Sequence, residues 1–162
     1  MLILGLDPGS TRVGYGLIKK EKNGLKFIKS GLLKIISKDK GQRLLELEKS
    51  FSRLLKKERP DLAAIEKLYF AKNLKTAMEV AESRGVLTLL IIKQKIPLLE
   101  YTPSEIKSGI TGYGRADKKT ILKIVVKILK IKKIQGGDDA ADALAAAIIA
   151  ASRPRFLEEN KI

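Results

Sequence analysis

Five acidic residues stand where two predicted strands end and a predicted helix begins. Asp7 closes one short apolar run, and Glu66 closes another. Asp138, Asp139 and Asp142 open an alanine-rich helix, in which residues three or four apart share a face. Carboxylates are the ligands that Mg²⁺ and Mn²⁺ prefer. Two such ions about 4 Å apart can neutralise a phosphodiester and activate water to attack it.

Each acid also has a simpler explanation when it is considered alone. Asp7 could hold a turn through an Asx hydrogen bond, and Asp138 or Asp139 could stabilise the helix start. Glu66 could be a surface residue. These explanations do not cover Asp142, which lies in an otherwise apolar run. The joint occurrence of the acids therefore favours a metal site.

The composition narrows the chemistry further. The 162 residues include no cysteine and no histidine, which excludes disulfides, thiol catalysis, histidine-based triads and Cys/His zinc sites. General base catalysis would then fall to metal-bound water. The net charge of +15, from 33 basic and 18 acidic residues, favours a polyanionic partner, above all nucleic acid. The alternative is a lysine-rich bias with solvated faces.

The chain shows no sign of a membrane or an export pathway. No apolar run is long enough to cross a bilayer, and Met1 leads directly into an apolar strand without a basic leader. We therefore expect a cytoplasmic protein that makes no membrane contact.

The elements that would position the acids form an α/β domain. The patterns predict strands over residues 2–7, 12–18, 25–36, 62–65 and 98–101, with a hairpin turn at Asn23-Gly24. They predict helices over residues 42–58, 74–93, 117–130 and 138–152, and one more that starts at residues 102–105 and precedes a loop at 109–116. This order favours a mixed sheet of five strands, three antiparallel and then parallel additions, with helices on both faces.

The predicted organisation places the acids at one edge of the sheet. Residues 1–153 are expected to form one domain, and residues 154–162 a short, loose tail. Ligands of such sheets bind beyond the carboxyl ends of the strands. If the strands that end at Asp7 and Glu66 are neighbours, both acids reach the same site.

Several motifs resemble the RuvC family of Holliday-junction resolvases, within the ribonuclease-H-like superfamily. The resemblance runs from Ile3 to about Ser152. Its motifs are Ile-Leu-Gly-Leu-Asp-Pro-Gly-Ser at 3–10, Gly-Tyr-Gly at 14–16, Ala-Ile-Glu at 64–66 leading into Ala-Lys-Asn at 71–73, Ser-Arg-Gly-Val at 83–86, and Asp-Ala-Ala-Asp-Ala-Leu-Ala at 139–145.

The resemblance implies a set of catalytic metal ligands. They are Asp7, Glu66, Asp139 and Asp142, which would hold two Mg²⁺ ions, or Mn²⁺ ions in their place. Asp138 lies one position early for the motif, but spacing alone leaves the choice between Asp138 and Asp139 open. Some relatives have a histidine at the third ligand, and this chain has none.

The resemblance also implies DNA-binding residues. Lys107 and Lys118 match family lysines near the scissile phosphate, although a solvated helix face is the simpler explanation of each. Tyr69 matches an aromatic that can stack on a base near the junction centre, with core packing as the alternative.

The activity implied is a homodimeric endonuclease that resolves four-way (Holliday) junctions by paired symmetric nicks in DNA recombination and repair. The helix over residues 74–93 would pair the subunits through Ala77, Ala81 and Gly85, and similar proteins work with an ATP-driven branch-migration complex. Three alternatives compete: a related nuclease acting on RNA or RNA–DNA hybrids, an actin-like phosphotransferase, and a non-catalytic DNA-binding module. The last is disfavoured because uncompensated acids weaken phosphate binding.

Overall fold

The fold is built on one five-stranded mixed sheet, seen in a computed structural model that describes residues 1–68 and 74–153. The strand order is β3-β2-β1-β4-β5. The strands are β1 (Leu2–Asp7), β2 (Arg12–Glu21), β3 (Gly24–Lys34), β4 (Leu62–Glu66) and β5 (Leu98–Tyr101). The first three pair antiparallel, and β4 and β5 add in parallel beyond β1, as predicted. The expected tail at 154–162 lies outside the described residues, as do Tyr69 and the 71–73 motif.

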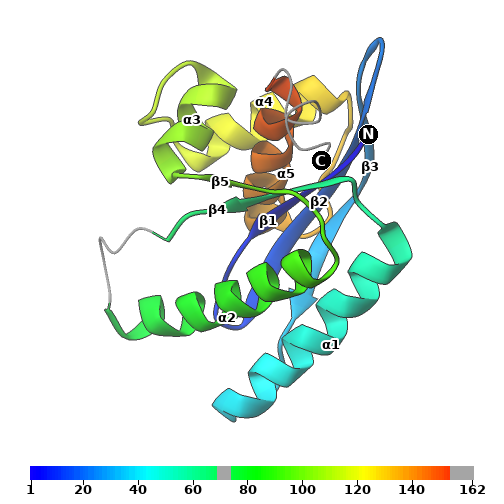
Figure 1. The fold of residues 1–162 in the computed structure, drawn as a ribbon. Coiled ribbons are helices and arrows are strands. Elements are labelled where there is room, and N and C mark those ends of the chain that lie inside the picture. Colours follow the sequence, from blue (N-terminus) through cyan, green and yellow to red (C-terminus); the bar gives the residue numbers. More distant parts are fainter. Residues whose placement is uncertain (69–73, 154–162) are drawn as a thin grey trace.

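Five helices within the described residues cover both faces of this sheet (Figure 1). They are α1 (Lys40–Glu58), α2 (Leu74–Lys93), α3 (Pro103–Thr111), α4 (Lys118–Leu129) and α5 (Gly137–Ser152). One buried cluster joins α1 and α2 to the sheet, and another joins α3, α4 and α5 to its opposite face. In the described parts of the chain, none of the helices combines the length and the apolar character needed to span a membrane.

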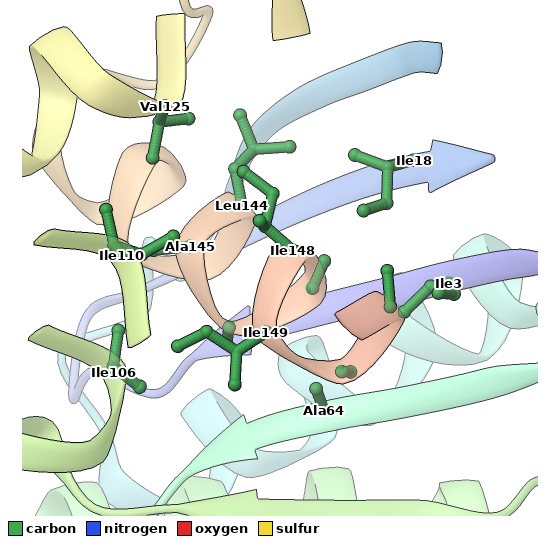
Figure 2. Packing of buried hydrophobic residues seen from close by; sticks show 14 of the residues in the cluster. Ile3, Ile18, Ala64, Ile106, Ile110, Val125, Leu144, Ala145, Ile148 and Ile149 are labelled. Carbon is green, nitrogen blue, oxygen red and sulfur yellow. The ribbon is translucent and has the colours of Figure 1, made fainter. Parts of the chain in front are cut away.

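The helix that carries three of the candidate acids, α5, lies directly against the sheet. A Cβ atom added at Gly5 would lie 1.8 Å from the Ala143 carbonyl oxygen, and one at Gly14 would lie 2.2 Å from that of Asp139. Glycines on the strands and alanines on the helix therefore allow unusually close contact. Figure 2 shows Leu144 and Ile148 of α5 packed among side chains from the sheet, α3 and α4.

Local signals place each predicted element, but several boundaries shift: β2 ends at Glu21 rather than residue 18, β3 at Lys34 rather than residue 36, and α1 begins at Lys40 rather than residue 42. Glu21 pairs with Gly24, so Lys22 and Asn23 form the hairpin loop, one residue earlier than predicted. Helix α3 continues to Thr111, three residues into the predicted loop, because Ile110 is buried in the core of that face. At its other end the predicted start is confirmed: Thr102 and Glu105 form a reciprocal capping box.

Candidate active site

Asp7 and Glu66 come together because their strands are parallel neighbours. Leu6 pairs with Ile65, so the two acids are the next residues of β1 and β4 and leave the same edge of the sheet. Both line a hollow whose other walls are Pro8, Lys67, Leu68, Val80 and Pro103. The adjacency on which the predicted site depended is thus confirmed.

Asp139 reaches the same site from α5. Asp7 pairs with Gly14 in the β1–β2 ladder, and Gly14 in turn touches the backbone of Asp139. A second hollow is lined by Asp7, Asp139, Arg12, Val80 and the intervening turn, residues 8–11. Asp7 therefore lines both hollows, as do Pro8 and Val80.

The structure distinguishes Asp139 from Asp138. The Asp138 side chain is exposed, whereas Asp139 is partly buried and pairs with Arg12 at 2.5 Å (Nε to Oδ2). The N-cap of α5 is Gly136, without a side-chain capping bond, so neither acid caps the helix. Capping does not explain the acids, and Asp139 is the one placed beside Asp7.

Burial and mutual repulsion perturb the strand acids strongly. Burial, followed by the charges of Glu66, Asp142 and Asp139, raises the pKa of Asp7 to about 8. Burial, followed by the charge of Asp142, raises the pKa of Glu66 to about 7. No described residue donates a hydrogen bond to the Asp7 carboxylate. The site therefore concentrates negative charge that its own groups do not fully compensate, as functional sites often do.

Asp142 and the two predicted lysines belong to the same electrostatic cluster. Lys118 Nζ, at the start of α4, lies 3.1 Å from Asp142 Oδ2. Burial raises the pKa of Asp142, and Lys118 opposes that rise. Lys107, half-buried on α3, opposes the rise that burial causes in the pKa of Glu66. Lys118 therefore contacts an acid directly, and Lys107 acts on one through its charge. Tyr69, the third predicted DNA-binding residue, is not among the described residues.

The donor set suits a hard divalent cation. All four acids offer oxygen only, and the raised pKa of Asp7 marks a place where added positive charge is favourable. Across residues 1–68 and 74–153, no three acidic side chains stand close enough together to form a ready-made metal group. Two of the four acids are instead held by cations of the chain, Asp139 by Arg12 and Asp142 by Lys118.

Two arginines support the site without having been predicted to do so. Arg12 pairs with Asp139, as described. Arg84 of α2 donates through Nε to the Glu66 carbonyl oxygen at 3.3 Å and pairs with Glu100 of β5. It therefore ties α2 to the ends of β4 and β5. Arg84 lies within the 83–86 motif, but nothing in the local sequence indicates its partners.

Comparisons with known proteins identify the family. The family model for crossover junction endodeoxyribonuclease RuvC matches residues 3–150. The RuvC protein of Petrotoga mobilis is 45% identical to this chain over 148 residues, 91% of each protein. The RuvC protein of Thermosipho melanesiensis is 45% identical over 160 residues, 96% of this chain and 100% of the relative.

The chain belongs to the RuvC family. As a member of it, the protein is a nuclease. Solved RuvC structures have the same fold: Thermus thermophilus RuvC aligns with a TM-score of 0.83 at 25% identity, covering 93% of each chain. T. thermophilus RuvC in complex with its Holliday junction substrate aligns with a TM-score of 0.84 at 25% identity, again over 93% of each chain. The predicted ribonuclease-H-like architecture is confirmed.

Proposed function

We propose that this RuvC-family protein is a Mg²⁺-dependent endonuclease that resolves four-way DNA junctions by paired symmetric nicks in recombination and repair. The observation that supports it most is the position of Asp7, which lines one hollow together with Glu66 and another together with Asp139. These acids stand in a chain with a net charge of +15, which favours a polyanionic substrate.

The proposed metal ligands are Asp7, Glu66, Asp139 and Asp142. Bound Mg²⁺ or Mn²⁺ would supply charge neutralisation at the phosphate and activation of the attacking water. Asp7 lines both hollows and is the acid suited to serve two ion positions. We assign Asp139 rather than Asp138 because only Asp139 shares a hollow with Asp7.

The chain's own cations would bind and orient the scissile phosphate. Lys118 is the better placed, because its ammonium group already contacts an acid of the site. Burial acts against its charge, but Asp142 raises the pKa of Lys118, so the side chain stays positive at neutral pH. We propose that Lys107 acts beside it and that Tyr69 stacks on bases near the crossover.

We further propose that the protein works as a homodimer paired through α2. Three exposed apolar residues of this helix, Met78, Leu89 and Ile92, share a face with Gly85, where an added Cβ atom would meet open space. A two-fold enzyme presents two active sites to the two strands that must be cut. By family resemblance we also expect cooperation with a branch-migration complex in the cytoplasm.

The test is incubation of a synthetic four-way junction with Mg²⁺ or with EDTA. Wild type should nick opposing strands only with the metal, and Asp7→Asn should bind the junction but not cut it. Asp138→Asn, which removes an exposed carboxylate, is the matched control and should cut normally. Undiminished cutting in EDTA, or by Asp7→Asn, would refute the proposed site.

Substrate and salt dependence complete this test. Duplex DNA and an RNA–DNA hybrid serve as competing substrates, and a preference for the hybrid would favour the alternative nuclease. Junction affinity should fall steeply with salt, by a slope of about −0.9 in log–log terms for each neutralised phosphate. A nearly flat slope would contradict nucleic-acid binding through the basic surface.

A further inference from the structure

The connection between α3 and α4, residues 112–117, carries an aromatic ring that the proposed function leaves without a role. The Tyr113 side chain is 61% exposed, and it is the one large aromatic exposed to this degree among the described residues. The neighbouring glycines, Gly112 and Gly114, leave the ring free of bulky neighbours in the chain. An exposed ring of this size is a recognition surface if its backbone is held in place.

The backbone of Tyr113 is held on both sides. Its N–H donates to the Thr111 hydroxyl at 3.0 Å, and its carbonyl accepts from the Ala116 N–H at 3.2 Å. Gly112 ends α3 in the left-handed conformation (φ 76°), which turns the chain sharply before the tyrosine. The ring is therefore presented to solvent from an ordered turn.

The helices on either side of this connection each carry a lysine of the site. Lys118, immediately after it, contacts Asp142, and Lys107 of α3 acts electrostatically on Glu66. A hollow lined by Lys107, Gly114 and residues 102–104 includes Pro103, which also lines the hollow that holds Asp7 and Glu66. Figure 1 shows the connection on the side toward which β1 and β4 run. Gly114, the residue after Tyr113, thus lines a hollow that shares Pro103 with the hollow of the acids.

The charges around Tyr113 indicate which ligand the ring faces. Arg115 is exposed two residues later, and Lys118 and Lys119 follow at the start of α4; the one acid between them, Asp117, caps that helix by accepting from the Thr120 N–H. A ring flanked by cations suits a nucleic acid. Its bases can stack on the aromatic side chain while its phosphates contact the lysines. A protein partner would more usually meet an apolar surround.

We propose that Tyr113 stacks on the base of a nucleotide adjacent to the scissile phosphate and thereby sets the nucleotide preference of the cut. This inference rests on the proposed nuclease function. It assigns the ring a specificity role rather than a catalytic one. Its loss should therefore change where the enzyme cuts more than how tightly it binds.

The first arm of the experiment measures stacking directly. Four-way junctions carrying 2-aminopurine on either side of the cut are titrated with protein in Ca²⁺, chosen to limit cleavage. Wild type and Tyr113→Phe should quench one probe position, whereas Tyr113→Ala and Tyr113→Leu should not. Leu45→Ala, whose side chain is 59% exposed on α1, is the matched control and should behave as wild type.

The second arm measures specificity in Mg²⁺, on a junction library randomised around the crossover. Tyr113→Ala and Tyr113→Leu should slow single-turnover cutting at the preferred sequence by roughly 10- to 100-fold and flatten the sequence profile. Tyr113→Phe should keep the profile. An unchanged profile with an unchanged probe signal in the alanine and leucine variants would overturn the proposal, as would an equal loss at every sequence.

The two arms separate this proposal from the proposed function. If wild type binds junctions but cuts none, the nuclease assignment fails, and the fluorescence arm alone decides the role of Tyr113. If wild type fails to bind junction DNA, both are refuted. Urea denaturation of each variant shows whether a loss reflects unfolding, and the phenylalanine and leucine variants keep the comparison intact if alanine unfolds.

Discussion

Removing the charge of Asp7 should stabilise the metal-free protein at alkaline pH. An acid whose folded pKa lies above its unfolded value stabilises the fold while it is protonated, and it loses that contribution as the pH rises through the folded pKa. Asp7 has a folded pKa of about 8 against an ordinary value of 3.8. Wild type in EDTA should therefore lose stability between pH 5 and pH 8.

The size of this loss follows from the shift. One pKa unit corresponds to about 1.4 kcal/mol, so the three pH units from 5 to 8 set an upper limit of about 4 kcal/mol for Asp7. Asp7 is only partly buried, and water near the carboxylate reduces the cost, so we expect about 2 kcal/mol. Glu66, with a pKa raised to about 7, adds a further loss in the same window. The chain has no histidine to obscure these titrations.

Urea denaturation in EDTA at several pH values tests this reasoning. The stability advantage of Asp7→Asn over wild type should be about 2 kcal/mol larger at pH 8 than at pH 5. Asp138→Asn controls for the change in net charge and should stay within about 0.5 kcal/mol of wild type, because that carboxylate is exposed. The reasoning fails if wild-type stability is flat or rises from pH 5 to pH 8, or if Asp7→Asn gains nothing.

Three further predictions concern the surroundings of Asp7. Asp139→Asn should weaken Mn²⁺ binding by more than about ten-fold, as measured by electron paramagnetic resonance, and Asp138→Asn should leave it unchanged. The reverse ranking would make Asp138 the ligand. Lys118→Ala should slow single-turnover junction cutting on the order of 100-fold while the fold stays intact, and an unchanged rate would remove Lys118 from the site. Gly14→Ala should cost about 1–3 kcal/mol in urea denaturation, because its Cβ would lie 2.2 Å from the Asp139 carbonyl oxygen; a neutral effect would mean that α5 shifts freely.

Local patterns predicted the parts of this molecule that local interactions determine. The capping box at Thr102 and Glu105 could be predicted from the sequence because its two partners are three residues apart. The neighbourhood of Asp7 and Glu66 was predicted only conditionally, since strand order depends on packing between distant segments. The Arg12–Asp139 pair joins residues 127 positions apart, and no local signal marks it. The predicted hairpin turn was one residue too late for a similar reason. The residues that form the loop are set by the β2–β3 register, which shifts between Leu17 and Ile18.

The close packing of α5 explains how one fold can hold several like charges together. Gly5 and Gly14 let the helix backbone contact the sheet. The backbone of Asp139 therefore cannot move away from Asp7 unless a buried helix moves with it. Repulsion among the acids is therefore opposed by the large apolar contact of α5, and it adds to burial in raising the pKa of Asp7. Substitutions that loosen α5 should accordingly lower the pKa of Asp7 and impair the site together. A site of this kind depends on the core behind it as much as on its own carboxylates.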